Sequence, residues 1–411
     1  MKKSHIALAI AALVPAFAQA QSNVTMYGVA EPTVDIGYKS TTVSTVTVGG
    51  VTTIAGSTSY KPGFRLQDGN SQGQGTSRVG FRGNEDLGGG LKANFQFEMG
   101  IRIDDGCVTT GAGNVCSSGN SGGNLFGRNA WAGLSGGFGE IRLGRQVLGS
   151  FGVQANSWAA GSSNGLYEVG ANTAPLMGGV RFSNAIKYIT PNLGGLTASL
   201  SLAAPETAGQ AATSSANAAG VVTTSTGVKT GIDLTVEYGA GPVYVGFGYN
   251  KTGGSGLAAT VATANDTKAF TFGGSFNLGV AQPFVNYTRQ TSSTATTVAL
   301  GSTSQIHKAF AVGVRAPVGA LTLIASYGKG DIDATLSAAG TTVISQAGQL
   351  KAYQIGAQYS LSKRTTLEAN YGQFRRDNAG GVFTPGTTTL VRVDGIAARE
   401  SGLNFGVRHA F

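Results

Sequence analysis

Charged side chains recur beside apolar ones in GRNAWAGLSGGFGEIRLGRQ, residues 127–146. Glycines interrupt this segment too often for a helix. Alternation with a period of two instead predicts strands with one polar and one apolar face. The chemistry open to a wall of this kind is electrostatic, because rows of arginine and lysine attract anions. We expect Arg128, Glu140 and Arg142 on the polar face, and Trp131, Ile141 and Leu143 on the apolar face.

The same alternation runs through most of the chain. In LKANFQFE (91–98), Leu91, Phe95 and Phe97 share one face, and Lys92 and Asn94 lie on the other. Such a period over ~8–12 residues predicts half-apolar strands. Sixteen segments have this form, beginning near Val24, Arg78, Leu91, Phe126, Phe138, Arg181, Leu196, Gly231, Val243, Lys268, Ala281, His307, Leu321, Lys351, Thr366 and Gly402.

Two architectures suit these strands. A soluble sandwich turns the apolar faces inward, whereas a transmembrane barrel turns them to lipid and its polar faces to an aqueous lumen. The segments have the ~9–11 residues that a tilted strand needs to cross a bilayer, and many end in aromatic residues, as an interfacial girdle requires. Short connections (84–90, 135–137) alternate with long polar ones, among them about 40–63, 252–266, 292–305 and 331–347.

The sequence therefore predicts an all-β fold: a sixteen-stranded antiparallel transmembrane β-barrel over residues 21–411, with long extracellular loops and short periplasmic turns. Sixteen strands enclose a lumen too wide for side chains to fill, so the barrel should hold water.

Residues 1–20 have the form of a cleaved signal peptide. Lys2 and Lys3 precede an apolar run, and Ala18-Gln19-Ala20 provides a cleavage site of small residues. The protein should therefore leave the cytoplasm. Beyond residue 20 no apolar run approaches the ~18 residues of a transmembrane helix.

Export also bears on the cysteines and on the net charge. Cys107 and Cys116 are the two cysteines of the chain, and an oxidising compartment favours a loop-closing disulfide between them. No histidine lies nearby to complete a metal site. The formal charge of +9 is spread singly along the strands, so nucleic acid is not an expected partner.

Several segments together resemble the general diffusion porins of Gram-negative bacteria, in the β-proteobacterial and neisserial branch. They are NVTMYG (23–28), SRVGFRGNEDLGGGLKANFQFE (77–98), the segment 127–146, RFSNAIKYITP (181–191) and the terminal GVRHAF. The resemblance spans nearly all of residues 21–411. It implies a water-filled outer-membrane channel for passive diffusion of small hydrophilic solutes and ions, without a cofactor or catalysis.

The resemblance also implies partners and two special segments. The barrel should be a homotrimer with one pore per subunit, surrounded by outer-membrane lipid and lipopolysaccharide. The third long loop, about 147–180, should fold into the lumen as a constriction. The terminal Phe411 should be the signal that the outer-membrane barrel assembly machinery reads.

The same resemblance places Arg78, Arg128 and Arg181 where related anion-selective porins carry a lumen arginine cluster. The period of two independently turns Arg78 and Arg181 inward. A constriction narrower than the ~8 Å Debye length would let these charges act on passing ions, and anion preference is the expected result. Further wall charge should come from Arg82, Arg142, Lys92 and Lys187.

Acids on the same wall leave open the alternative that the lumen has no net charge filter. Glu98, Glu140, Asp233 and Glu237 should also face inward and could cancel a net filter. The loop 147–180 carries Glu168 as its only acid, whereas many porins carry several acids on this loop.

Other functions fit the sequence less well. A channel tuned to one anionic class, such as dicarboxylates or phosphate, would use the same arginines. A structural or adhesive barrel would act through its long loops. An enzyme would need an activated nucleophile, yet residues 21–411 hold only two histidines, His307 and His409. His409 is expected on the lipid face, and His307 opens a strand without a GxSxG-like elbow.

Overall fold

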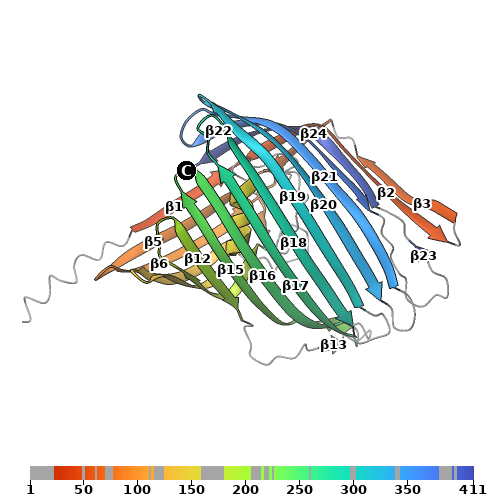
Figure 1. Cartoon of the computed structure of the whole chain (residues 1–411), viewed down its shortest axis with the longest axis horizontal. Coiled ribbons are helices and arrows are strands. Elements are labelled where there is room, and N and C mark those ends of the chain that lie inside the picture. The colour runs from red at the N-terminus through yellow and green to blue at the C-terminus, as the bar shows by residue number, and fades with distance from the viewer. Residues whose placement is uncertain are drawn as a thin grey trace, which may run out of the picture.

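Antiparallel pairing of each strand with the next along the chain builds a closed barrel of sixteen strands (Figure 1). The computed structural model describes residues 23–48, 51–60, 63–69, 77–110, 113–114, 125–158, 180–204, 214–216, 222–224, 226–258, 261–296, 302–337, 343–378, 391–392 and 396–411. The predicted signal peptide lies outside these residues. All sixteen predicted strands are present, so the fold class read from the sequence is confirmed.

The barrel strands have the following bounds. They are β1 (Asn23–Ala30) continued by β2 (Pro32–Val48), β5 (Arg78–Gly88), β6 (Leu91–Ile101), β9 (Asn129–Gly136), β10 (Gly139–Val147), β11 (Arg181–Ile189), β12 (Leu196–Ala203), β15 (Thr226–Ala240), β16 (Val243–Ala258), β17 (Val261–Phe276), β18 (Gln282–Thr296), β19 (Ser302–Val318), β20 (Leu321–Ser337), β21 (Val343–Ser360), β22 (Thr365–Asn378) and β24 (Ile396–Ala410).

Shorter elements decorate the barrel. The strands β3 (Val51–Tyr60) and β4 (Phe64–Asp68) pair with β2. The remaining small strands are β7 (Val108–Thr110), β8 (Gly113–Asn114), β13 (Ser214–Ala216), β14 (Val222–Thr224) and β23 (Val391–Arg392), and the described helix is α2 (Gly149–Trp158). No helix in the described ranges is long and apolar enough to cross a membrane.

The two faces of the wall differ as the alternation predicts. Leu143, Leu234 and Phe405 point outward and are exposed, Leu143 by 55%. The inward positions carry polar side chains, and Asp233 and Asn286 among them are almost fully buried. An exposed apolar exterior and a polar interior suit a barrel surrounded by lipid.

Strand length divides the barrel into a low and a tall part. The barrel strands β5, β6 and β9 to β12 have 8 to 11 residues, whereas β15 to β22 have 14 to 18. Much of the predicted loops 40–63, 252–266, 292–305 and 331–347 is therefore strand, which corrects the sequence-based boundaries. These segments are polar, but ladder hydrogen bonds need only the backbone, so pairing continues beyond the apolar band.

The two ends of the barrel sequence meet where the wall closes. β1 and β2 pair with β24. The ladder runs from Val29, which pairs with Ala410, to Ser44, which pairs with Ile396. At the short-turn end, Gly28 and Phe411 exchange backbone hydrogen bonds of 3.0 and 3.1 Å. The Phe411 ring covers Gly28, because a Cβ added there would lie 2.3 Å from Phe411 Cζ. This contact requires glycine at position 28.

A side chain at position 28 should therefore loosen the closure. Gly28→Val would displace the Phe411 ring and crowd the Arg78 carbonyl oxygen, 2.7 Å from the added Cβ. Overpacking of this kind costs about 1–3 kcal/mol, so the midpoint of urea unfolding should fall. Gly137→Ala is the control, since nothing lies within 4 Å of its added Cβ. Equal midpoints for the two variants would contradict the closing role of this contact.

Candidate functional site

Glu98 is the centre of a charged cluster on the inner wall. Its Oε1 accepts a hydrogen bond of 2.6 Å from Arg128 Nε, and Arg78 Nε lies 3.7 Å from its Oε2. Tyr27 donates its hydroxyl to Oε2 at 2.8 Å, and Asn129 Nδ2 lies 3.4 Å from Oε1. Four side chains from three strands and one connection thus fix a carboxylate that is itself nearly buried.

Arg181 completes this cluster from the first residue of β11. Its charge interacts with those of Arg128, Arg78 and Glu98, and with that of Arg145. Arg181 Nε is buried without a hydrogen-bond partner in the part of the chain that the structure describes. Two of the predicted arginines, Arg78 and Arg128, therefore pair with one carboxylate, and Arg181 interacts with it electrostatically. A single carboxylate neutralises only part of the charge of the three arginines.

A second group of cations lies closer to the short-turn end. Arg142 and Lys187 face each other in the ladder between β10 and β11. Arg142 pairs with Glu140 at 2.7 Å, and Lys187 Nζ donates to the Val147 carbonyl oxygen at 3.1 Å. Lys187 also interacts with the charge of Asp233. These cations are thus more fully balanced by acids than the cluster around Glu98.

Aromatic rings support two of the lumen guanidinium groups. Arg142 Cζ lies 4.2 Å from the centroid of the Trp131 ring, and Arg82 Cζ lies 5.0 Å from that of Tyr27. Trp131 also donates Nε1 to Gln96 Oε1 at 3.1 Å. Cation–π contacts hold a guanidinium against the ring and leave its edge available to solvent.

Trp131 therefore faces the lumen, and the prediction that it faces lipid is wrong. It is only 7% exposed, whereas Ile141 and Leu143 do face outward as predicted. The error comes from the start of β9 at Asn129. Arg128 lies before the strand. Alternation counted from Arg128 therefore assigns the wrong side of the wall to Trp131. Tyr27 also faces inward, where its hydroxyl donates to Glu98, and it was not among the predicted site residues.

The helix α2 lies against another part of the inner wall, over β15 to β18. Asp233 on β15 accepts hydrogen bonds from the backbone nitrogens of Gly149 and Ser150, at 2.9 and 3.3 Å, and from the Ser150 hydroxyl. A carboxylate at this position satisfies the unpaired N–H groups of the first turn and complements the helix dipole. Asp233 is 0% exposed.

Contacts farther along α2 hold its other end. Asn286 Nδ2 donates to Ser157 Oγ at 2.7 Å, and Gln154 Nε2 lies 3.3 Å from Thr288 Oγ1. Two glycines of the wall permit this close approach. A Cβ at Gly273 would lie 2.2 Å from Ser157 Oγ, and one at Gly248 would lie 2.7 Å from Ser150 Cα. The described start of the predicted loop 147–180 is therefore packed inside the barrel.

Other predicted features fall outside the described residues. These are Glu168 with most of the loop 147–180, and Cys116. Cys107 is disulfide-bonded, and its pairing with Cys116 stays a prediction. Lys92, Glu140 and Glu237 are described and lie on the inner wall, where Glu237 accepts a hydrogen bond of 2.7 Å from the Tyr244 hydroxyl.

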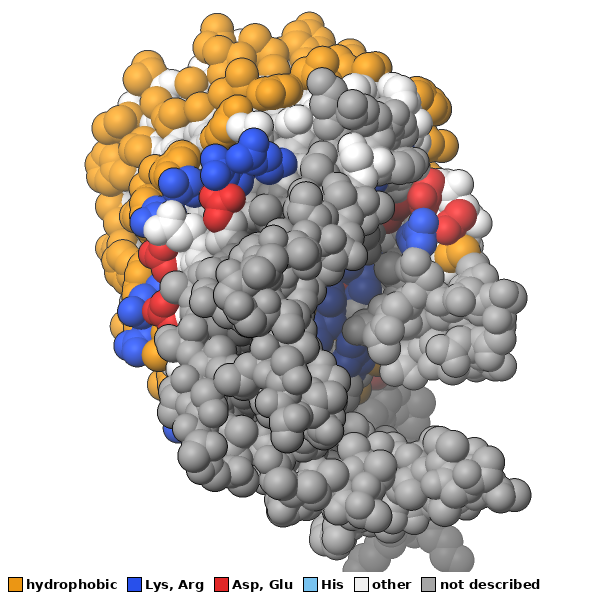
Figure 2. Space-filling view, turned by 90° about the vertical axis from the view of Figure 1, so that its right-hand side faces the viewer, with side chains coloured by type: hydrophobic (Ala, Val, Ile, Leu, Met, Phe, Trp, Pro, Cys, Tyr) orange, Lys and Arg blue, Asp and Glu red, His pale blue; other side chains and the backbone are white. Residues whose placement is uncertain are grey.

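The inner wall thus offers charge and hydrogen-bond donors rather than a reactive constellation. Lys and Arg side chains are visible inside the opening of the barrel in Figure 2. Among the described residues, no group of three or more His, Cys, Asp or Glu side chains could hold a metal ion. Such a wall can attract, orient and screen small charged solutes in water.

Comparisons with known proteins agree with this geometry. Residues 7–379 match the family model described as Gram-negative porin. The chain is 32% identical to outer membrane porin protein 32 of Delftia acidovorans, and the alignment covers 100% of each chain. It is also 32% identical to the major outer membrane protein P.IB of Neisseria lactamica, over 51% of this chain and 52% of the relative.

Solved structures show the same fold. The anion-selective porin from Comamonas acidovorans superimposes with a TM-score of 0.58 and 26% identity, over 95% of this chain and 100% of that chain. OmpT of Vibrio cholerae, at 16% identity and a TM-score of 0.57, shares the fold over 96% of this chain and 100% of its own. The chain therefore belongs to the Gram-negative porin family and forms a water-filled diffusion channel in the outer membrane.

Proposed function

We propose that this porin admits small hydrophilic anions in preference to cations, and that Arg78, Arg128 and Arg181 set this preference. The observation that carries the proposal is the excess of arginine over acid at Glu98: the guanidinium groups of Arg78 and Arg128 pair with this one carboxylate, and the charge of Arg181 interacts with all three. The lumen therefore carries a net positive charge at the level of Glu98. An anion that passes it gains a favourable interaction that a cation of equal size does not.

The loop 147–180 sets the size limit in this proposal. Its first part, α2, is fixed to the wall by Asp233 and Asn286 and narrows the lumen. The described part of this loop carries no charged side chain. Selectivity would therefore come mainly from the wall that carries the arginines, and α2 would act as a neutral barrier. Anion preference is also the property for which the structural relative from Comamonas acidovorans, an anion-selective porin, is named.

Liposome swelling tests the proposal with solutes rather than salt. Small carboxylates should enter proteoliposomes faster than zwitterionic or cationic solutes of matched size, and uptake rates should stay proportional to concentration. Saturation by one dicarboxylate or by phosphate would favour the substrate-tuned channel instead. Equal rates for all three charge types would contradict a charge filter.

Glu98→Gln should strengthen the preference. The substitution removes the negative charge at the centre of the cluster and keeps a hydrogen-bond acceptor for Arg128 and Tyr27. A unit charge about 10 Å from an ion in water contributes ~0.4 kcal/mol, which is about a twofold change in relative permeability. The zero-current potential in a potassium chloride gradient measures this ratio. A decrease in chloride preference would show that Glu98 is not part of the filter.

The proposal also covers chemistry and assembly. The channel would have no enzymatic activity. It would lose residues 1–20 on export and assemble as a homotrimer with one pore per subunit. Phe411 would be the residue that the barrel assembly machinery reads. Deletion of Phe411 should reduce the amount of folded porin in the outer membrane, whereas Phe405→Leu should not. Equal membrane levels for the two variants would contradict this role.

A further inference from the structure

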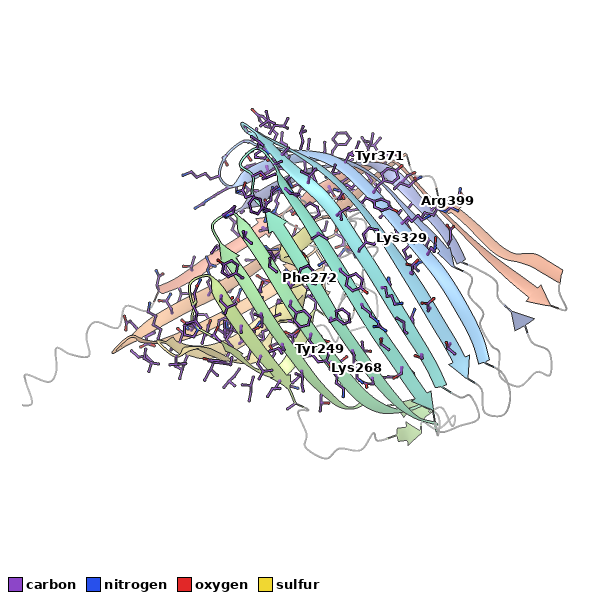
Figure 3. The ribbon with its side chains drawn as sticks, in the orientation of Figure 1. Tyr249, Lys268, Phe272, Lys329, Tyr371 and Arg399 are labelled. Carbon is purple, nitrogen blue, oxygen red and sulfur yellow. The ribbon has the colours of Figure 1, made fainter. Side chains whose placement is uncertain are left out.

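Trp131 lies inside the barrel, against the guanidinium group of Arg142. The distance from Arg142 Cζ to the centroid of the ring is 4.2 Å, and the ring is almost fully buried. Many aromatic residues of the wall lie on its outer surface instead, as Tyr249, Phe272 and Tyr371 do in Figure 3. A tryptophan that faces the lumen beside a cation is not part of the lipid-facing girdle, so its role must lie inside the channel.

The guanidinium of Arg142 is still open to the lumen on one side. The side chain keeps 26% of its surface exposed, although Trp131 covers one of its flat faces. Within the described residues, its guanidinium donates one hydrogen bond, from Nη2 to Glu140 Oε2 at 2.7 Å. The helix α2 packs over β15 to β18, away from β9 and β10, which carry this stack. Because guanidinium groups stack on aromatic rings through their flat faces, Arg142 can hold a second ring on its open face.

A chain of hydrogen bonds fixes the stack relative to the arginine cluster. Trp131 donates Nε1 to Gln96 Oε1 at 3.1 Å, and Gln96 donates Nε2 to the Tyr27 hydroxyl oxygen at 2.5 Å. Tyr27 in turn donates its hydroxyl to Glu98 Oε2 at 2.8 Å, and Glu98 pairs with Arg128. The chain ends on a charged acceptor, and hydrogen bonds in such a chain strengthen one another. The ring is therefore held in one orientation.

The distance between the stack and the cluster suits one small ligand. In the ladder between β6 and β9, Trp131 pairs with Gln96 and Asn129 pairs with Glu98. The two levels are thus two residues apart along the strand, which corresponds to about 7 Å. An aromatic ring with one carboxylate, extended by a hydrogen bond of about 3 Å, has roughly this length. A solute of this kind can contact both levels at once.

We propose that the stack of Trp131 and Arg142 is a binding site for aromatic carboxylates. The ring of the solute would lie on the open face of Arg142, and its carboxylate would point to Arg128 and the other arginines at the level of Glu98. A saturated carboxylate of equal charge would make only the second contact. The inference rests on the proposed function, because the ligand must enter as an anion, and it adds a class of solute that charge alone does not select.

Benzoate and cyclohexanecarboxylate are the probes, because they carry the same charge on rings of similar size and differ in the aromatic face. Each is titrated onto the reconstituted porin in a planar bilayer, and block of the chloride current gives its dissociation constant. Benzoate should bind on the order of fivefold more tightly, which is the size of one cation–π contact. The ratio of the two constants is the measured quantity, since a change in pore width or net charge affects both probes alike.

R142K should bring this ratio close to one. Lysine keeps the positive charge but has no flat face that can lie between two rings. The matched control is R315K, because Arg315 also lies on the inner wall and donates its guanidinium to the Gln358 amide at 3.4 Å. W131L removes the ring that supports Arg142 and should lower the ratio as well, so two different substitutions test the same stack.

The pattern of ratios decides between the outcomes. A ratio that falls in R142K and W131L but not in R315K supports the site. Equal binding of the two carboxylates by the unmodified channel, or a ratio that R142K leaves unchanged or that R315K lowers equally, overturns it. If such a channel still favours chloride, only this inference fails and the proposed anion preference stands. A potassium-favouring channel that neither carboxylate blocks would overturn both.

Discussion

Replacing Arg78, Arg128 and Arg181 together by glutamine should lower the chloride-to-potassium permeability ratio by on the order of eightfold, if each unit charge contributes about a factor of two. The inner wall at this level would then keep Glu98 without its cations, so the channel should favour potassium. The measurement is the zero-current potential of the reconstituted porin in a potassium chloride gradient. Arginine-to-lysine replacement at the same positions is the matched control, because it keeps the charge.

Folding must be monitored in the same experiment. Glu98 is nearly buried and loses two charged partners in the triple glutamine variant, which raises the cost of keeping its carboxylate inside. Adding Glu98→Gln to the triple variant removes that cost and should leave a wall without preference. A folded triple variant that still favours chloride as strongly as the natural protein would contradict the assignment of the filter to these arginines.

Freeing α2 from the wall should produce the second large effect. Asp233→Ala removes the acceptor for Gly149, Ser150 and the Ser150 hydroxyl. Loss of a helix cap costs about 0.5–2 kcal/mol, and each buried donor left unpaired adds ~1–3 kcal/mol. The helix should then fluctuate within the lumen, and single-channel recordings should show several-fold larger open-channel noise with transient closures.

A steric variant tests the same helix independently. Gly273→Val would place a side chain where Ser157 now lies, since an added Cβ is 2.2 Å from Ser157 Oγ. It should reproduce the noise of Asp233→Ala. Gly253→Val is the control, because its nearest contacts would be 3.8 Å away. Quiet channels of normal conductance from both Asp233→Ala and Gly273→Val would show that α2 does not limit the lumen.

Most of the barrel follows from local patterns in the sequence. The predicted starts at Leu91, Arg181, Leu196, Val243 and Leu321 coincide with those of β6, β11, β12, β16 and β20. A strand between water and lipid must alternate, and it must start after a turn, so both signals are written in the chain. Strand ends beyond the apolar band were missed, because backbone pairing there leaves no side-chain pattern.

The candidate site was predictable only in part. Inward positions for Arg78 and Glu98 follow from alternation. The closeness of Arg78 to Arg128 and Arg181 was expected only from the family resemblance, and the central place of Glu98 among them was not predicted. The prediction that Trp131 faces lipid was wrong because β9 begins only at Asn129, and alternation assigns faces only within a strand. The Asp233 cap could not be foreseen either, because it joins β15 to a helix 83 residues away in the sequence.

The outward-facing cations Lys329, Lys351, Arg375 and Arg399 show a different limit of sequence-based prediction. They are spread singly along the sequence, and composition alone gives no reason to group them. Only the register between strands brings them into one row. Their shared level on the outer surface becomes visible once the strand directions and the lipid-facing side are known.

The zero-current potential of the unmodified porin, measured across a planar bilayer at low and at high potassium chloride concentration, tests the central claim most directly. A charged cluster in a water-filled lumen predicts stepwise open channels with a chloride-favouring potential at low salt. This preference should shrink toward 1 M salt, where the Debye length falls to ~3 Å. A potassium-favouring potential, or no preference at either concentration, would contradict the arginine filter.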